Sequence, residues 1–294
     1  MANKIQIVLH SLPREIDEVK RIVDQLARSQ FYIGDTNNVI LDFTLNISDK
    51  LTDWENSKIP KEYFIDKFTY IESLSPFVNR FDVSTTCLGC NDKRRNAINS
   101  DTDATHILYL DTDVYFSDYN LTMMFDAISQ IKNKYHIISS EILQLWDSSW
   151  DVISNERTRN TDRSKKLWHT NPYRVFDRRE PCIPKLRQIQ TVKFGGGWFN
   201  LFNIELLKFI TIPDSLGPYG LDDTFIAEAS MHMLRKGYDI RQYVLSDMIV
   251  IEDRMFRDYP YDNYVKTKSD MKDFWRKESH KNYSLEMEKF LKRI

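Results

Sequence analysis

The chain has 294 residues, of which 41% are hydrophobic and 13% aromatic, enough to build a large hydrophobic core. Its net charge of -2 gives no basic excess that would favour nucleic-acid binding and no acidic excess that would favour disorder. With only 8 glycines and 9 prolines, collagen-like and low-complexity structures are excluded.

The amino-terminal segment and the cysteines favour a cytoplasmic protein. Residues 1–19 contain one short apolar run followed by charges, unlike a signal peptide. No window reaches the roughly 18 apolar residues of a transmembrane helix. Cys87 and Cys90 form a lone Cys-x-x-Cys pair without the second pair that a structural zinc site needs. Reduced cytoplasmic thiols are therefore the simpler interpretation.

Strand and helix patterns alternate through the first half of the chain. The expected elements are strands at 5–9, 38–47, 105–110 and 135–142, and helices at 14–30, 90–99 and 121–132. Aromatic residues scattered over residues 48–85 indicate an irregular or helical insertion. The alternation predicts an α/β protein with a mostly parallel central sheet.

The second half begins with a basic connection, residues 157–187, which has ten Lys/Arg against three Asp/Glu. The expected elements after it are a strand entering a glycine run at 191–199, helices at 203–210 and 222–235, a strand at 238–245 and a polar helix from 266 to 294. Gly237 is the expected stop of the second of these helices. We expect a catalytic domain over residues 1–245 and a helical extension over 246–294.

Two aspartates close the buried run HILYLDTDVYF, residues 106–116. Successive strand residues face opposite sides of a sheet, so Asp111 and Asp113 are expected to point the same way. Like charges that close repel unless a cation joins them, and hard oxygen ligands suit Mg²⁺ or Mn²⁺. The pattern favours a metal-bound diphosphate at the carboxyl end of the strand. A surface loop that happens to contain two aspartates is the simpler alternative.

Other classes of protein also use an Asp-x-Asp sequence, and the residues around their motifs can be compared with those of this chain. An EF-hand needs Gly at the sixth loop position and Glu at the twelfth, where this chain has Phe116 and Thr122. A haloacid-dehalogenase-like phosphatase also has a strand followed by Asp-x-Asp, with the first aspartate as nucleophile. That motif usually lies near the amino terminus and continues with Thr or Val, where this chain has Tyr115. The phosphatase remains the alternative enzyme.

Five motifs in order resemble the GT-A-fold glycosyltransferases, most nearly the inverting family-2 type that includes chitin and polysaccharide synthases. They are the first strand with its Pro-containing turn at 7–16, Arg95-Asn96, the Asp-x-Asp strand at 106–113, the Gly-rich segment at 194–207, and the sequence GLDDTF at 220–225. The resemblance covers residues 5 to about 245. It implies a GT-A (Rossmann-like nucleotide-diphospho-sugar transferase) fold.

The resemblance also implies an activity. This would be a metal-dependent glycosyltransferase (EC 2.4 type) of polysaccharide biosynthesis that moves a sugar from a nucleotide-sugar, with a UDP-sugar favoured, to a glycan or lipid-linked acceptor hydroxyl with inversion. Asp113 would bind the divalent cation, Mn²⁺ or Mg²⁺, and Asp111 would bind the ribose or the cation through water. Asp223 would be the general base, with Asp222 beside it. Helix N-capping is the simpler role for this second pair.

Residues at the ends of the first two strands are expected to bind the nucleoside. His10, Ser11 and Leu12 would border the base and the ribose. Asn46 or Asp42 would hydrogen-bond a pyrimidine edge, and Asn46 is preferred because it lies nearer the carboxyl end of its strand. Strand-end capping is the alternative role for both.

Further donor contacts are expected from the helix before the Asp-x-Asp strand and from the glycine run. Arg95 would face the diphosphate, because a guanidinium suits phosphate oxygens, and a solvated helix face is its alternative. Gly196 and Gly197 would leave room for the sugar, and Trp198 would stack on it. A β-bulge with a core tryptophan is the alternative there.

The expected partners are a nucleotide-sugar donor and a glycan or lipid-linked acceptor, without nucleic acid. The basic connection could bind an acidic or phosphate-linked sugar, or be a solvated linker. The carboxy-terminal segment could contact the inner face of an anionic membrane, although a helix that closes the domain fits it better. A non-catalytic sugar-nucleotide or carbohydrate-binding protein on the same scaffold is the alternative outside the enzymes.

Overall fold

The structure is a computed structural model that describes residues 2–86, 88–145, 185–189, 199–253 and 261–294. Its helices are α1 (Ile16–Ser29), α2 (Lys61–Ser73), α3 (Cys90–Ile98), α4 (Asn120–Gln130), α5 (Ile204–Ile210), α6 (Asp222–Arg235) and α7 (Ser269–Arg293). Its strands are β1 (Ile5–Ser11), β2 (Val39–Asn46), β3 (Thr52–Asp53), β4 (Val78–Asn79), β5 (Asp82–Ser84), β6 (His106–Leu110), β7 (Val114–Phe116), β8 (Tyr135–Leu145), β9 (Lys185–Ile189), β10 (Phe199–Asn203), β11 (Ile240–Asp253) and β12 (Lys266–Thr267).

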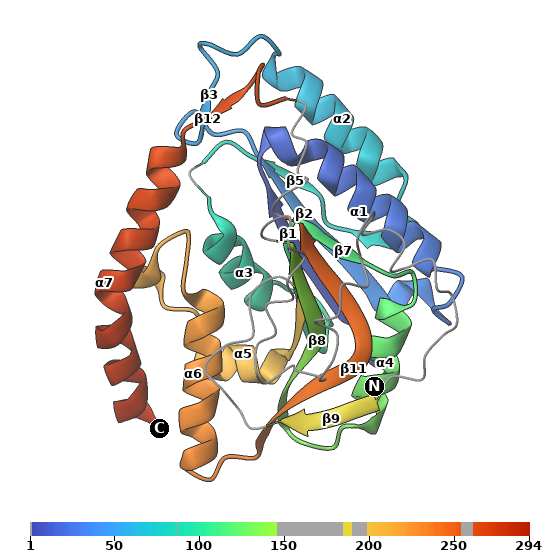
Figure 1. Ribbon diagram of the computed structural model, residues 1–294, viewed down its shortest axis with the longest axis vertical. Helices are drawn as coiled ribbons and strands as arrows, with labels where there is room; N and C mark the ends of the chain where they lie inside the picture. Colours follow the sequence, from blue (N-terminus) through green and yellow to red (C-terminus); the bar gives the residue numbers. More distant parts are fainter. Residues whose placement is uncertain (1, 87, 146–184, 190–198, 254–260) are drawn as a thin grey trace.

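The central sheet has the strand order β4-β2-β1-β6-β10-β8-β11-β7, with β5 also paired to β2 and β9 to β11 (Figure 1). Strand β1 runs parallel to β2 and β6, and β8 runs parallel to β11. Strands β10, β7 and β9 run antiparallel to their neighbours. The expected mostly parallel α/β sheet is therefore confirmed, and the three antiparallel strands are an addition that the alternating pattern did not reveal.

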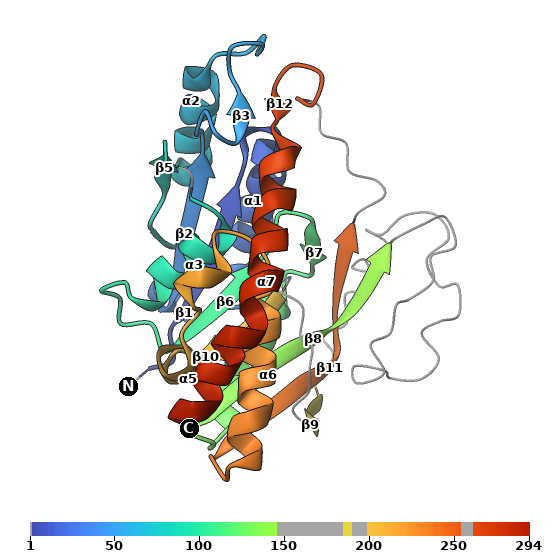
Figure 2. The ribbon, with the colours of Figure 1, turned by 90° about the vertical axis from the view of Figure 1, so that its left-hand side faces the viewer.

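Helices cover both faces of the sheet, and each face has its own hydrophobic core (Figures 1 and 2). Helices α1, α2 and α4 lie on one face, and α3, α5, α6 and α7 lie on the other. Because both faces are covered, strands such as Ile5–Ser11 and Val39–Asn46 are buried almost throughout instead of alternating with polar residues. This burial explains the near-continuous apolar runs in the sequence.

The segment 48–85, expected to be an irregular or helical insertion, contains α2 and three short strands. Two of them, β4 and β5, pair with β2 and extend the sheet at that edge. Phe64 and Phe68 of α2 are buried in the core, which accounts for the scattered aromatic residues. Further along, the expected domain boundary at residue 245 falls inside β11.

A pair of buried histidines lies at the start of β6 and β8. The Nε2 atoms of His106 and His136 are 2.8 Å apart and share a hydrogen bond. The Nδ1 atom of His106 lies 2.8 Å from Thr105 Oγ1. Burial, with the neighbouring His136 as the second cause, lowers the pKa of His106 to about 3. Burial also lowers the pKa of His136, so folding favours the neutral form of both rings.

This histidine pair predicts sensitivity to acid. Because the His106 pKa is lower in the folded chain than in the unfolded one, stability is lost as the pH falls below about 6.5. His106 alone should reduce the free energy of unfolding by about 2 kcal/mol between pH 7.5 and pH 5. In His106→Gln that loss should shrink by about the same amount, measured by urea unfolding at both pH values. The exposed His280→Gln is the control, and an unchanged pH difference in His106→Gln would contradict the assignment.

Candidate active site

The carboxyl ends of three neighbouring strands bring the expected site residues to one edge of the sheet. The parallel register pairs His10 of β1 with Thr44 of β2 and Val8 of β1 with Tyr109 of β6. Asp111, which follows β6, therefore lies at about the level of His10. Neighbouring strands are about 4.8 Å apart, so the row from Thr44 to Asp111 spans about 10 Å.

The Asp-x-Asp sequence forms a turn between β6 and β7. Strand β6 ends at Leu110, so the alternation from which a shared direction of the two aspartates was expected does not extend to them. Asp113 is 7% exposed, whereas the Asp111 side chain is 35% exposed. Arg21 of α1 donates to the carbonyl oxygens of residues 112 and 114 at 2.9 and 3.0 Å, and thereby holds the turn from the other face of the sheet.

Arg94 of α3 is the buried cation of the site, and the sequence interpretation did not select it. Its Nη1 atom donates to Asp222 Oδ2 at 2.7 Å and its Nη2 atom donates to Asp111 Oδ1 at 3.1 Å. The guanidinium also stacks 4.3 Å from the centre of the Tyr109 ring. Burial alone would lower the Arg94 pKa, but the carboxylates around it, Asp222 first, raise it well above its usual value. A permanently charged side chain thus joins the Asp-x-Asp turn to α6.

Arg95, the residue expected to face the diphosphate, points elsewhere. Its guanidinium donates to the carbonyl oxygens of Pro213 and Gly217, at 3.0 and 3.1 Å, and pairs with Asp92. Consecutive helical residues are rotated by about 100°, so Arg94 and Arg95 cannot face the same group. These contacts correct the expectation, because Arg94 lies beside Asp111 and Arg95 holds the loop before α6.

The second aspartate pair begins α6. Leu221 is the N-cap residue and makes no side-chain capping bond, so neither aspartate is the cap. Asp222 is buried and pairs with Arg94, whereas Asp223 Oδ1 accepts from the Thr224 backbone N–H at 2.6 Å. Burial, followed by the charge of Asp222, raises the pKa of Asp223 to about 6. A carboxylate with such a pKa is suited to take a proton near neutral pH.

The charges of this group favour a divalent cation. Asp111, Asp222 and Asp223 surround the single guanidinium of Arg94, so carboxylates outnumber the cation. The described part of the chain has no group of three His, Cys, Asp or Glu placed to hold a metal by themselves. Mg²⁺ usually binds one or two carboxylates together with water and substrate phosphate oxygens, so Asp111, the more exposed of the two, and Asp113 are the residues that could hold a cation that arrives with a diphosphate.

Of the three residues expected at the end of β1, His10 is the one whose side chain is only half-buried. Its Nε2 atom lies 3.0 Å from the Leu88 carbonyl oxygen. Ser11 is fully buried and donates to the Thr44 carbonyl oxygen at 3.2 Å. Leu12 is buried in a small apolar cluster. Ser11 and Leu12 therefore support the edge of the sheet, and His10 is the member that can reach a ligand.

Asn46 is engaged with the backbone of the loop before α3. Its Nδ2 atom donates to the carbonyl oxygens of Thr86 and Leu88, at 3.2 and 2.5 Å, and its Oδ1 atom accepts from the Ser48 N–H at 2.9 Å. The amide therefore holds this loop over the strand ends. The preference for Asn46 over Asp42 as the base-binding residue is not supported by these contacts, because Asp42 is the one that lines a pocket.

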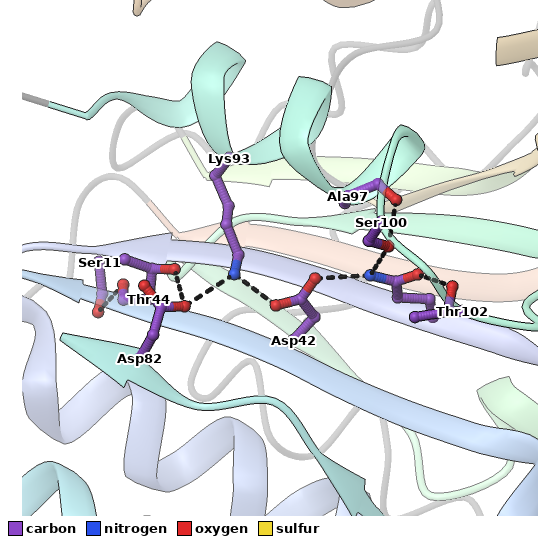
Figure 3. Close-up of polar contacts among 9 residues, drawn as sticks. Ser11, Asp42, Thr44, Asp82, Lys93, Ala97, Ser100 and Thr102 are labelled. Carbon is purple, nitrogen blue, oxygen red and sulfur yellow. Dashed lines mark hydrogen bonds and ion pairs between the residues drawn. The ribbon is translucent and has the colours of Figure 1, made fainter. Parts of the chain in front are cut away.

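This pocket, of about 380 Å³, lies between α3 and strands β2 and β5, and it does not include Asp111. Its floor is polar (Figure 3): Lys93 Nζ pairs with Asp42 and, at 3.2 Å, with Asp82, while Thr44 Oγ1 donates to Asp82 Oδ1 at 2.7 Å. Behind it, the Gln6 amide donates to Asp42 Oδ2 at 2.6 Å. Phe81 and Leu88 add apolar walls. A polar floor with apolar walls suits a flat heterocycle.

The structure does not test the roles expected for the glycine run. Gly196, Gly197 and Trp198 lie outside the described residues, as does most of the basic connection at 157–187. Their expected contacts with the sugar and the acceptor therefore remain predictions.

Comparisons with known proteins identify solved structures with a similar fold. No family model matches the sequence, and no curated protein matches it. Among solved structures, the chain is similar to a mannosyltransferase from Pyrobaculum calidifontis in complex with GDP-Man and Mn²⁺, with a TM-score of 0.53, 10% identity, and 88% of this chain and 59% of that chain covered. It is also similar to S. aureus TarS 1-349 in complex with UDP, with a TM-score of 0.50, 13% identity, and 84% and 60% covered.

The chain spans about three fifths of the length of each of these two structures. At identities of 10% and 13% the likeness establishes the fold and leaves the activity open. Both neighbours are glycosyltransferases of the GT-A type. The expectation from the five sequence motifs is thus confirmed at the level of architecture, and the chain has the GT-A fold.

Proposed function

We propose that the protein is a metal-dependent glycosyltransferase that moves a sugar from a nucleotide-sugar to an acceptor hydroxyl. The observation that carries the proposal is the buried Arg94, which bonds both the partly exposed Asp111 and Asp222, the neighbour of Asp223 at the start of α6. A carboxylate suited to a cation is thereby tied to the helix start that carries a carboxylate suited to accept a proton. The fold neighbours bound to GDP-Man with Mn²⁺ and to UDP support the same class of donor.

On the donor side, we place the base in the Lys93 pocket, the ribose at His10 and the diphosphate at Asp111 and Asp113. The row of strands β2, β1 and β6 gives this order, and a nucleoside diphosphate is long enough to follow it. Lys93 can donate to a base carbonyl and Asp82 can accept from the adjacent ring N–H. Uracil presents such a pair, and a UDP-sugar is the favoured donor. A bound Mn²⁺ or Mg²⁺ would offset the charge that develops on the leaving diphosphate.

On the acceptor side, Asp223 takes the proton. The acceptor oxygen bonds to the anomeric carbon as the bond from that carbon to the diphosphate oxygen breaks, which inverts the configuration. With a pKa of about 6, the Asp223 carboxylate is largely ionised at neutral pH and can accept the proton from the hydroxyl. Arg94 pairs with the neighbouring Asp222 and holds its side chain in place beside Asp223.

The acceptor is proposed to be a glycan or a lipid-linked sugar. In the described part of the chain, no helix has the length and apolar character needed to span a bilayer. Helix α7 exposes Phe274 and Leu285, at 49% and 52%, and has seven Lys/Arg against five Asp/Glu, and this modest basic excess supports peripheral contact with an anionic membrane surface.

Two alternatives make different predictions. A haloacid-dehalogenase-like phosphatase would use Asp111 as its nucleophile and would release phosphate from p-nitrophenyl phosphate with Mg²⁺. Arg94 already binds the Asp111 carboxylate, and this favours the transferase. A non-catalytic sugar-nucleotide or carbohydrate-binding protein would show neither transfer nor donor hydrolysis, so an activity that is present in the wild type and lost in the Asp223 variant below separates it from the transferase.

Binding of the nucleotide should depend on the cation. UDP at 100 times its dissociation constant should stabilise the protein by about 2.7 kcal/mol in Mn²⁺ or Mg²⁺ and by far less in EDTA, because the diphosphate meets Asp111 and Asp113 through the metal. A thermal-shift panel of UDP, GDP, CMP and dTDP ligands with and without Mn²⁺ measures this. Asp113→Asn should lose the gain and the exposed Asp101→Asn should keep it. Equal stabilisation by UDP in EDTA would rule out the metal bridge.

The proposed binding of the base in the Lys93 pocket can be tested by a substitution at the edge of that pocket. Asp82→Asn removes a carboxylate that pairs with Lys93 and can accept from the base, so the affinity for UDP should fall roughly tenfold, a loss of about 1.4 kcal/mol. The requirement for Mn²⁺ should remain, because Asp82 belongs to the base end of the row. Isothermal titration calorimetry with UDP and Mn²⁺ gives both quantities, with Asp101→Asn as the matched surface control. Wild-type affinity in Asp82→Asn would place the base elsewhere.

Asp223→Asn should separate catalysis from binding. Transfer, or donor hydrolysis if no acceptor is at hand, should fall by roughly 10²–10⁴, the span of a general acid or base, while affinity for UDP with Mn²⁺ is retained. The variant should also be more stable at neutral pH. The Asp223 pKa is raised from 3.8 to about 6 in the folded protein, so the folded state binds its proton more tightly and stability falls as the pH rises through that window.

Relative to the wild type, Asp223→Asn should therefore gain about 1–3 kcal/mol of unfolding free energy at pH 7.5 and much less at pH 4. Urea unfolding at the two pH values measures the difference. Full transfer activity in this variant would remove Asp223 from the base role, and a loss of nucleotide binding as severe as in Asp113→Asn would assign it to the donor site.

A further inference from the structure

The turn that leads into α6 has an unusual backbone. Gly217 and Gly220 have φ angles of 70° and 95°, and Leu221, which is not a glycine, has a φ of 57°. A leucine in this left-handed region is strained, and such a conformation persists only where its surroundings hold it. The next two residues are Asp222 and Asp223, so this turn decides where both carboxylates are presented.

The amino end of α3 holds the turn from one side. The Asn91 side chain is buried, and its Nδ2 atom donates to the carbonyl oxygens of Gly217 and Gly220, at 3.1 and 3.0 Å. Its backbone N–H donates to the Pro218 carbonyl oxygen at 2.9 Å. The two chains touch so closely that a Cβ atom on Gly89 would lie 2.2 Å from that same oxygen. One asparagine thus bonds both ends of the turn.

Helix α7 holds the turn from the other side. The hydroxyl of Ser279, which is fully buried, donates to the Gly220 carbonyl oxygen at 2.9 Å, so this oxygen accepts from both α3 and α7. Asn282 donates to the Ser215 carbonyl oxygen at 2.7 Å. Figures 1 and 2 show α7 lying alongside α6, in agreement with the contacts between the two helices. The carbonyl before Leu221 is therefore fixed by two donors from separate parts of the chain.

We infer that Asn91 and Ser279 are positioning residues for the proton acceptor: they hold Leu221 in its left-handed conformation and thereby set Asp223 against the donor site. The inference rests on the proposed function. Without the two donors, Leu221 can relax to an ordinary conformation, and the start of α6 then turns. Asp223 moves with it, and a displacement of about 1 Å can reduce a rate by 10²-fold.

Ser279→Ala tests this role, with the exposed Ser284→Ala on the same helix as the control. In Ser279→Ala the kcat of transfer should fall roughly 10- to 100-fold, while the affinity for UDP with Mn²⁺ stays within about twofold of the wild type. A general loss of folding would instead reduce nucleotide binding and kcat together. Should Ser279→Ala fail to fold, Asn91→Ser takes its place with the same readouts.

A second change supplies a rescue that a purely structural role would not give. Glycine adopts the left-handed conformation without strain, so Leu221→Gly added to Ser279→Ala should restore a large part of kcat, about fivefold or more. Unchanged kcat in Ser279→Ala, a parallel loss of UDP affinity, or no recovery in the double variant would each overturn the inference. If Asp223→Asn abolishes transfer while Ser279→Ala keeps it, only this inference fails. If Asp223→Asn keeps full transfer, the proposed base and the inference fail together.

Discussion

The buried ion pair between Arg94 and Asp222 is the interaction on which the site depends. Both side chains are 5% exposed, and a buried charge that loses its partner is strongly destabilising. The pair therefore fixes the position of α3 relative to α6 at the carboxyl edge of the sheet. Because the other guanidinium nitrogen of Arg94 bonds Asp111, the turn after β6 is fixed to the same two helices. Three segments of the chain are thus tied together by one guanidinium, and the negative charges around it remain in excess.

Helix α3 contributes three consecutive cations that point in three directions. Lys93 faces the pocket beside β2, Arg94 faces the aspartates, and Arg95 faces the loop before α6. A rotation of about 100° per residue produces this division directly. A basic run that looks like one solvated face in the sequence is therefore three separate contacts, and two of the three side chains are buried. The helix therefore contacts the Lys93 pocket, the carboxylates and the loop before α6 at once.

The main elements were predictable from the sequence because long apolar runs and helical spacing are strong local signals, and the places of the aspartate pairs, after β6 and at the start of α6, followed from them. The choice between Arg94 and Arg95 was not, because it depends on the rotation of α3 against the sheet, which no local pattern fixes. Asn46 was preferred for its place at a strand end, yet the loop over that end uses its amide. The edge strands β4 and β5 are two and three residues long, too short to leave a period.

The shared bonding of the Gly220 carbonyl also has a consequence for the order in which the protein matures during synthesis. The two residues that meet there, Gly220 and Ser279, are 59 positions apart, and α7 follows every other helix of the described chain. In a growing chain the strands of the proposed donor site, and then the aspartates of α6, are made before the helix that fixes their turn. The proposed proton acceptor is therefore held in its final position only after the last helix has been synthesised and has packed against α6.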